Sequence, residues 1–316
     1  MKSSNFNQEI LKIKEEIQDL KLKIDKREDI NTNEEIISLE KRVHSLNYNE
    51  NSEALELVKK SRNQKRPTTR GLCEKIFKDF IELHGDGLYS DDSSIIGGIG
   101  ILGDIPVTVI GHQKGRNVHE NVRRNFGMAH PEGYRKALRL MREAELFGRP
   151  LITFIDTPGA YPGIEAEKRG QSRAIAQNLY ALSGLKVPSI SIVIGEGGSG
   201  GALALGITDR IFMFSNATYS VISPEGCATI LWKDAGQAAK AAKHLSLSAE
   251  SHLNSKIIDN IIEEPDFEKQ DTYPEFIESL KKLLITTINS LSERPIDKLL
   301  MERYKKFRNI GYNQYL

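Results

Sequence analysis

The sequence predicts a mainly parallel α/β fold, in which strands and helices alternate along the chain. Two runs of β-branched and apolar residues, LITFI at 151–155 and SISIVI at 189–194, are typical of buried strands. Each run leads into a segment rich in glycine or proline, and a helical pattern follows. A further strand is expected at 210–214, and this alternating order is the signature of a parallel sheet covered by helices.

Residues 1–60 predict a helical hairpin in front of this fold. Thr32 and Glu35 have the spacing of a capping box, so a second helix is expected to begin there after a short polar turn. Because the apolar stripe is narrow, we expect the hairpin to contact the body or another subunit and to serve assembly. The residues that repeat at intervals of three or four are Phe6, Ile10, Ile13, Ile17, Leu20 and Ile24, then Ile36, Leu39, Val43 and Leu46.

Residues 61–262 are expected to form the α/β domain itself. Short apolar runs interrupted by glycine within 95–110 indicate paired strands and turns. A helix is expected over 131–147, where Pro131 suits the first turn, and another over about 169–183, which Gly184 would cap. From residue 263 to 316 the sequence becomes rich in lysine and leucine and predicts a C-terminal helical segment.

Composition excludes several classes of protein. The 316 residues carry a formal net charge of +1, which predicts neither a nucleic-acid partner nor a membrane partner. The chain has 2 cysteines, Cys73 and Cys227, far apart in sequence, so neither a disulfide framework nor a cysteine zinc site is expected. No apolar run approaches the roughly 20 residues of a membrane helix. These features predict a protein of a reducing, intracellular compartment.

The segment GEGGSGGALALG at 195–206 matches two well-known motifs. Its glycines fit the dinucleotide fingerprint GxGxxG, but the next strand ends in Ser215-Asn216 rather than in the acid which that site needs. Its GxSxG pattern fits the nucleophile elbow of serine hydrolases, with Ser199 as nucleophile. Asp209 with His244 or His252 would follow in the order of a triad, so this alternative stays open.

A third interpretation is that the glycines expose backbone N–H groups. Glycines at a helix start leave amides uncovered, and two such amides can bind a developing oxyanion. Tight packing of strand on helix is the plainer explanation, because glycine also permits close approach. The neighbouring loop DTPGAYPG at 156–163 would wall the same cleft with main chain. The acids of this cleft are Asp156, Glu165, Glu167 and Glu196.

A basic stretch lies between Gly111 and Arg142. It holds eight Lys or Arg against two acids, Glu120 and Glu132. An excess of this kind suits an anionic ligand, although a solvated helix face accounts for part of it. Those expected to face anionic groups are Lys114, Arg116, Arg123 and Arg124.

Seven motifs together resemble the carboxyltransferase α-subunit family of multi-subunit acetyl-CoA carboxylases, as found in bacteria and plastids. They are GHQKGR (111–116), RRNFGM (123–128), PEGYRKALRLM (131–141), ITFIDTPGAYPG (152–163), RGQS (169–172), IGEGGSGGALA (194–204) and ATYSVISPEGCA (217–228) followed by ILWK (230–233). The resemblance runs from about 66 to 265.

The resemblance implies a crotonase-like (ClpP-like) ββα spiral core and a role in making malonyl-CoA for fatty acid synthesis. It implies that the Gly200 and Gly201 amides hold the biotin ureido oxygen, and that Gly197 and Gly198 shape the turn. The loop residues Thr157, Pro158 and Gly159 would bind substrate. Ser199 would then be a small residue at a helix start rather than a nucleophile.

The resemblance also implies partners. The chain would work with a zinc-carrying β subunit in an α2β2 assembly and would hold no metal of its own. Carboxybiotin would arrive on a biotin carboxyl carrier protein, loaded by a biotin carboxylase, and acetyl-CoA would be converted to malonyl-CoA. The compartment would be a prokaryotic cytoplasm or a plastid stroma. A serine hydrolase, a hydratase with Glu165 and Glu167 as its carboxylate pair, and a non-catalytic scaffold subunit remain the alternatives.

Overall fold

The computed structural model describes residues 12–13, 15–18, 39, 53–267 and 272–311. Most of the expected N-terminal hairpin therefore lies outside the described residues. A helix at 53–61 leads into the body. Among the described residues, no helix is long and apolar enough to cross a membrane.

One mixed sheet organises the body, with seven strands in the order β1-β2-β3-β4-β5-β6-β8 and β7 paired to β5. The first three strands are antiparallel, and from β3 onward the neighbours are parallel. The expected paired strands and parallel layer are thus both present. The bounds are β1 Lys78–Glu82, β2 Ile95–Leu102, β3 Ile105–His112, β4 Leu151–Thr157, β5 Ser189–Gly198, β6 Arg210–Phe214, β7 Thr218–Ser220 and β8 Asn260–Ile262.

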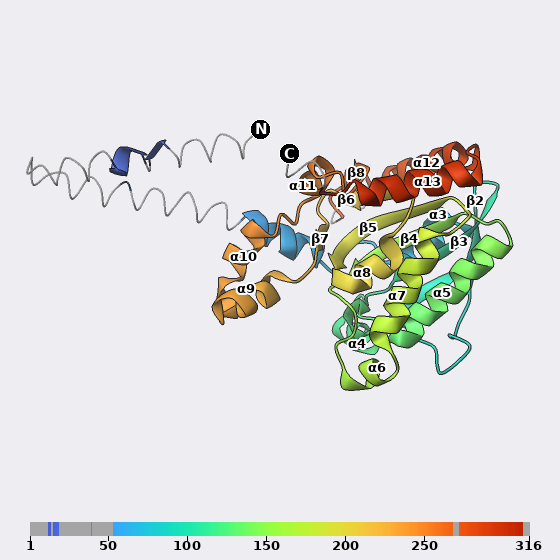
Figure 1. Cartoon of the computed structure of the whole chain (residues 1–316), viewed down its shortest axis with the longest axis horizontal. Helices are drawn as coiled ribbons and strands as arrows, with labels where there is room; N and C mark the ends of the chain where they lie inside the picture. Colours follow the sequence, from blue (N-terminus) through green and yellow to red (C-terminus); the bar gives the residue numbers. More distant parts are fainter. Residues whose placement is uncertain (1–11, 14, 19–38, 40–52, 268–271, 312–316) are drawn as a thin grey trace, which may run out of the picture.

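Helices cover the sheet and carry the connections between its strands. Helix α5 packs against β2 and β3, α8 against β4 and β5, and α7 against both α5 and α8. In Figure 1, α12 and α13 lie above the sheet, and α9 and α10 form a lobe that projects away from it. The bounds are α3 Thr69–Ile76, α4 Val118–Arg123, η1 Asn125–Gly127, α5 Pro131–Leu146, α6 Ile164–Lys168, α7 Gln171–Ser183, α8 Ser199–Gly206, α9 Pro224–Trp232, η2 Ala235–Gln237, α10 Ala238–His244, α11 Ala249–Asn254, α12 Tyr273–Ser292 and α13 Ile296–Arg308.

Helix α5 illustrates how the sequence specifies these elements. Pro131 occupies its first turn, where a missing N–H costs nothing. The face expected from the spacing is buried: Tyr134, Met141 and Ala144 are fully covered and Leu138 nearly so. The helix ends just before Gly148, whose φ of +64° favours glycine.

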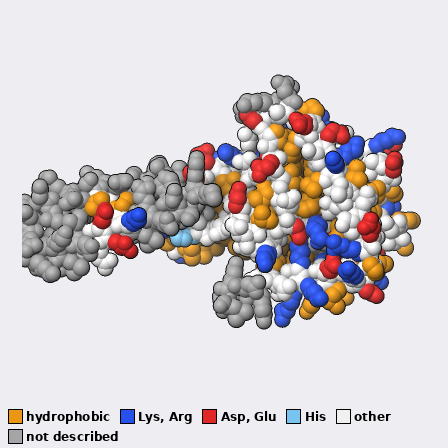
Figure 2. Space-filling model, turned by 90° about the horizontal axis from the view of Figure 1, so that it is seen from above, with side chains coloured by type: hydrophobic (Ala, Val, Ile, Leu, Met, Phe, Trp, Pro, Cys, Tyr) orange, Lys and Arg blue, Asp and Glu red, His pale blue; other side chains and the backbone are white. Residues whose placement is uncertain are grey.

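The core is one large cluster with a small satellite. Strand and helix side chains of the α/β layers meet those of α12, which contributes Phe276, Leu280, Leu284, Ile288 and Leu291. The expected C-terminal helices thus complete the same core as the strands. The satellite consists of Val58, Ala242 and Leu247, so the helix at 53–61 packs against α10. On the surface seen in Figure 2, hydrophobic side chains lie in bands between charged ones, and Lys and Arg side chains gather in one area of the body.

A buried ion pair attaches α13 to the sheet. Arg303, 2% exposed, donates to both carboxylate oxygens of Asp209 at 2.8 Å and to the carbonyls of Leu182 and Leu185 at 2.7 and 2.8 Å. We expect Arg303→Ala to lower the free energy of unfolding by about 3–5 kcal/mol, because a buried carboxylate loses its partner. Urea unfolding measures this. The exposed neighbour Lys305→Ala is the control, and equal losses for both variants would contradict the expectation.

Candidate active site

The glycine segment is the end of a strand rather than the expected turn. β5 continues through Gly198, and β7 pairs with its last three residues, so Glu196–Gly198 stays extended. On the other side Thr157 of β4 pairs with Gly197. The turn itself is confined to Ser199, which begins α8 with a φ of +51°. The sequence did not predict this extension of β5, because it depends on pairing with β7, a strand of three residues that follows about 20 residues later.

Close packing explains most of these glycines. A Cβ on Gly198 would lie 2.1 Å from the carbonyl oxygen of Pro158, and one on Gly197 would lie 2.7 Å from the ring of Tyr219. A Cβ on Gly201 would lie 2.8 Å from the carbonyl carbon of Gly159. The main chain at 197–201 thus packs closely against the loop after β4, as expected if these glycines serve close packing.

Gly200 is different, because packing does not demand it. A Cβ there would meet only the side chain of Ile175, at 3.6 Å, which is ordinary contact. Gly200 is half-buried, and no side chain caps α8. The first N–H groups of a helix have no partner within it, and the helix dipole makes them attractive to an anion. The start of α8 can therefore receive a negatively charged oxygen.

The opposing loop is closed by its own threonine. Thr157 is buried, and its hydroxyl donates to the Gly159 carbonyl at 2.6 Å and accepts from the Gly159 amide at 3.1 Å. Gly159 has a φ of +155° and open space where a Cβ would lie. Pro158 lines a small hollow beside the glycine strand. Of the three predicted loop residues, Pro158 and Gly159 face open space, whereas the Thr157 hydroxyl is used within the loop.

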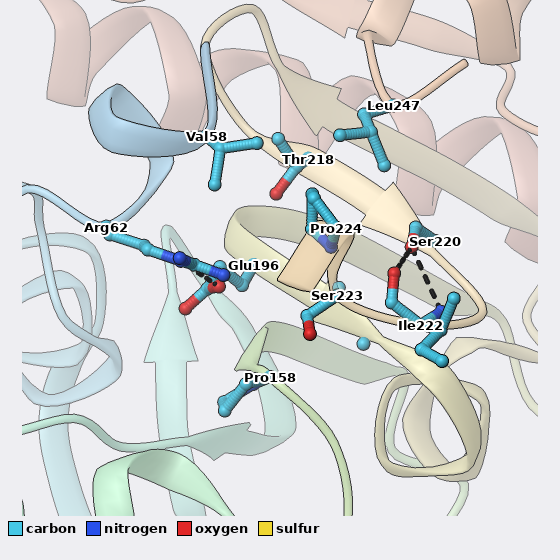
Figure 3. A pocket seen from close by; sticks show the side chains of 12 residues that line it. Val58, Arg62, Pro158, Glu196, Thr218, Ser220, Ile222, Ser223, Pro224 and Leu247 are labelled. Atoms are coloured by element: carbon cyan, nitrogen blue, oxygen red, sulfur yellow. Dashed lines mark hydrogen bonds and ion pairs between the residues drawn. The ribbon is translucent and has the colours of Figure 1, made fainter. Parts of the chain in front are cut away.

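A chain of ion pairs runs along the carboxyl ends of the strands. Lys114, after β3, contacts Asp156 of β4 at 2.8 Å and Glu196 of β5 at 2.6 Å. Glu196 accepts from Arg62 at 2.7 Å, and Arg62 also pairs with Glu225 of α9 at 2.7 Å. Figure 3 shows Arg62 and Glu196 pointing toward one another at the wall of the hollow. The network therefore links the entering chain, three strands and the projecting lobe.

Electrostatics keep this network fully charged. Burial alone would lower the pKa of Lys114, but the carboxylates of Asp156 and Glu196 raise it. Burial alone would raise the pKa of Glu196, but Lys114 and Arg62 lower it. Because both carboxylate oxygens of Glu196 accept from cations, neither group is suited to remove a proton near neutral pH. Proton abstraction here needs a base from outside these residues.

The four predicted basic residues do not gather in one place. Only Lys114 reaches the glycine strand. Arg124 is buried and turns inward to donate to the Ser93 carbonyl at 2.7 Å, and burial lowers its pKa. Arg123 lies exposed at the end of α4, and Arg116 lines a separate pocket beside α3.

Sequence reasoning missed two polar groups beneath the site. The ring of His112 is fully buried and lies against the backbone of Phe154 and Gly201. Burial lowers the pKa of His112 to about 3, so the ring is neutral. The Tyr134 hydroxyl is buried and has no hydrogen-bond partner among the described residues, and it would lie 3.0 Å from a Cβ on Gly201. His112 ends an apolar run and Tyr134 lies on the apolar face of α5, so both are predicted as core, and only the tertiary structure brings them close to Gly201.

The hydrolase alternative finds no triad. Asp209 accepts from the amide and hydroxyl of Ser189 at 2.8 Å, so it lies at the amino end of β5. Ser199 follows the other end of this ten-residue strand, roughly 30 Å away. His252 is bonded to the Tyr219 carbonyl at 2.7 Å.

The hydratase alternative lacks its buried acids. Glu165 is exposed and pairs with Lys168 at 2.8 Å, and Glu167 is exposed as well. In the described part of the chain, no three His, Cys, Asp or Glu side chains are grouped to hold a metal.

Comparison with known proteins identifies the family. The family model described as acetyl co-enzyme A carboxylase carboxyltransferase-like matches residues 3–311. The chain belongs to this family.

Curated members of the acetyl-CoA carboxylase carboxyltransferase family match along nearly the whole chain. The acetyl-CoA carboxylase carboxyl transferase α subunit of Shouchella clausii is 51% identical over 309 residues, which are 97% of this chain and 95% of its own length. That of Listeria welshimeri is 49% identical and covers 98% of both chains. These matches confirm the resemblance and the activity class, the α component of a carboxyltransferase.

Solved structures confirm the crotonase-like fold of the carboxyltransferases. The transcarboxylase 12S structure aligns with a TM-score of 0.59 and 18% identity, over 74% of this chain and 43% of its own. The β subunit of geranyl-CoA carboxylase from P. aeruginosa aligns with a TM-score of 0.56 and 18% identity, over 72% and 42%. At this identity the likeness concerns the fold alone.

Proposed function

We propose that this chain supplies the biotin-facing half of the carboxyltransferase site, in which the amides at the start of α8 hold an oxyanion. The observation that carries the proposal is the uncapped helix start at Gly200, open on one side and walled by the loop after Thr157 on the other. Donors fixed in this way stabilise charge that develops during a reaction without having to reorganise. The same amides would not suit a neutral group as well.

The ion pairs of Lys114 and Glu196 support this assignment, because neither group is a free base. Carboxybiotin, delivered on a carrier protein, supplies both the carboxyl group and, through its ureido ring, the base that takes a proton from acetyl-CoA. The chain therefore needs only to bind and orient. The Gly200 and Gly201 amides hold the ureido oxygen, and the ion pairs of Lys114 keep the strand ends in register. The thioester oxygen of acetyl-CoA is assigned to donors of a β subunit.

Partners follow from the same proposal. The chain works with a β subunit that carries the zinc, in an α2β2 assembly, and receives biotin from its carrier protein after a biotin carboxylase has loaded it. The matched relatives shown above are bacterial, which supports a cytoplasmic setting. Residues 1–60 are assigned to assembly.

The lobe next to the site supports the docking of the β subunit. The apolar side chains of Val221, Ile230 and Leu231 are 74%, 62% and 61% exposed, and apolar surface exposed together is typical of a protein interface. The Arg62–Glu225 ion pair holds this lobe beside the glycine strand. A partner that completes the site must approach this side. We assign the apolar face of α9 to the β subunit.

Replacing Leu231 with Asp should weaken association with the β subunit at least tenfold, because a charge would be buried in an apolar contact. Surface plasmon resonance with immobilised β subunit measures it. The exposed Tyr180→Asp, on α7 and 84% exposed, is the matched control. Equal affinities for both variants would exclude α9 from the interface.

One experiment tests the function directly. The purified chain is mixed with a cognate β subunit, and decarboxylation of malonyl-CoA is followed in the presence of free biotin. We expect activity only for the mixture, because neither chain holds a complete site. Turnover by this chain alone, or none after assembly is shown by gel filtration, would contradict the proposal.

Ser199→Ala should retain carboxyltransferase activity within about tenfold of the wild type. The serine begins α8, and the amides, rather than its hydroxyl, are the proposed donors. The same assay of the α–β mixture measures it. Loss of activity together with labelling of Ser199 by a fluorophosphonate would favour the hydrolase alternative.

A further inference from the structure

A tyrosine of α5 reaches the start of α8 from within the core. The Tyr134 side chain is completely buried and belongs to the large core cluster. Its hydroxyl oxygen would lie 3.0 Å from a Cβ on Gly201. The N and Cβ atoms of one residue are two covalent bonds apart, so this oxygen lies within about 6 Å of the Gly201 amide nitrogen. The hydroxyl is therefore next to one of the two amides assigned to the oxyanion.

This hydroxyl has no hydrogen-bond partner among the described residues. A buried polar group without a partner lowers stability, and most such groups in folded proteins are paired. Burial raises the pKa of Tyr134, and the negative charge of Asp92 acts in the same direction, so the hydroxyl keeps its proton at neutral pH. A phenylalanine would fill the same core position without this loss. Packing alone therefore does not explain the oxygen.

The other neighbours of Gly201 have fixed dipoles. The carbonyl carbon of Gly159 and the nitrogen of Ala160 would lie 2.8 and 2.9 Å from the same Cβ, and both belong to the main chain. The neutral ring of His112 lies against the Gly201 backbone from the end of β3. A hydroxyl differs from these groups because its hydrogen rotates about the C–O bond. The Tyr134 hydroxyl can thus turn its dipole when a charge appears nearby.

We propose that Tyr134 is a positioning residue of the carboxyltransferase reaction. Its oxygen supports Gly201 from beneath and keeps the first amides of α8 directed at the ureido oxygen. As negative charge develops on that oxygen, the hydroxyl turns the positive end of its dipole toward it. The surroundings are buried, and a low dielectric allows a dipole to act on a charge that it does not touch. This inference rests on the proposed function, to which it adds the residue beneath the amides.

The effect should appear in turnover rather than in binding. Biotin binds with a neutral ureido group, and the negative charge on its oxygen develops only as the reaction proceeds. A group that stabilises only the transition state changes kcat and leaves KM almost unchanged. The contribution of Tyr134 is therefore separable from simple binding of biotin.

Tyr134→Phe tests the inference, because it removes the hydroxyl and keeps the ring. In the α–β mixture with malonyl-CoA and free biotin, kcat should fall at least fivefold while the KM for biotin stays within twofold of the wild type. The melting temperature should equal or exceed that of the wild type, because an unpaired polar atom leaves the core. A residue that serves folding alone would give a lower melting temperature and a normal kcat.

Tyr219→Phe is the matched control. Tyr219 is also buried, and its hydroxyl would lie 3.4 Å from a Cβ on Gly206, at the other end of α8. The same change there should leave kcat unchanged. A fall of less than fivefold for Tyr134→Phe, an equal fall for both variants, or a fall that comes with a lower melting temperature would overturn the inference.

Wild-type activity separates this inference from the proposed function. An active wild-type mixture beside an unaffected Tyr134→Phe variant overturns the role of Tyr134 alone. An inactive wild-type mixture overturns the proposed function, and the role of Tyr134 with it.

Discussion

A chain carrying Gly201→Val should form malonyl-CoA with its β subunit at least a hundredfold more slowly than the wild type. A Cβ at this position would lie 2.8 and 2.9 Å from main-chain atoms of Gly159 and Ala160, and 3.0 Å from the Tyr134 hydroxyl. Main-chain atoms cannot move aside as a flexible side chain can, so α8 must shift. Its amides would then no longer point at the ureido oxygen. Removing one oxyanion donor typically costs about 2.7–4 kcal/mol of barrier.

The matched control is Gly200→Ala, one residue earlier. Its Cβ meets only the Ile175 side chain at ordinary contact distance, so the melting temperature should stay that of the wild type. Steady-state rates and thermal unfolding of both variants, each saturated with β subunit, separate catalysis from folding. The expectation is wrong if Gly201→Val turns over within tenfold of the wild type.

The elements with a regular period could be predicted from the sequence. The apolar face of α5 and the buried strand β4 follow from spacing and composition, since both depend on local pattern and burial. The predicted ends of helices are less accurate where a glycine interrupts the helical pattern. Gly170, with a φ of +85°, divides the expected helix near 169–183 from a short preceding helix, α6.

The candidate site was predictable only in its backbone. Glycine content located the start of α8, because few other residues allow main chain to approach main chain this closely. The partners of charged side chains could not be read in the same way. Lys114 and Arg124 lie in one basic stretch, yet one is held by two carboxylates at the strand ends and the other by a carbonyl of a distant loop. Such pairings depend on contacts between residues far apart in sequence.

The ion pairs of Lys114 connect the architecture of the site to its chemistry. A parallel sheet brings the ends of β3, β4 and β5 together, and acids at two of them would repel each other without a cation between them. The backbone amide of Glu196 also donates to the Asp156 carboxylate at 3.0 Å, so Asp156 helps to fix the backbone of β5 just before the glycines. One partly buried lysine therefore separates the two acids and ties the ends of three strands together.

Replacing Lys114 with Met should lower the free energy of unfolding by about 3–5 kcal/mol at pH 7, because it leaves Asp156 without its cation and facing Glu196, which keeps only Arg62. Urea unfolding of the variant and the wild type measures the loss. Lys168→Met is the matched control: its ion pair with Glu165 is 66% and 69% exposed, and exposed pairs contribute about 0–1 kcal/mol.

The pH dependence of this loss identifies its cause. In the wild type the cations lower the pKa of Glu196, so its contribution to stability is present above the unfolded pKa, about 4.3, and is lost as pH falls through the folded value. In Lys114→Met the two carboxylates raise each other's pKa, and a proton bound in the folded state relieves their repulsion. The difference in unfolding free energy between wild type and variant should therefore shrink as pH falls from 7 to 5. A difference that stays constant over this range would show that lost packing of the lysine stem, rather than repulsion between the two carboxylates, destabilises the variant.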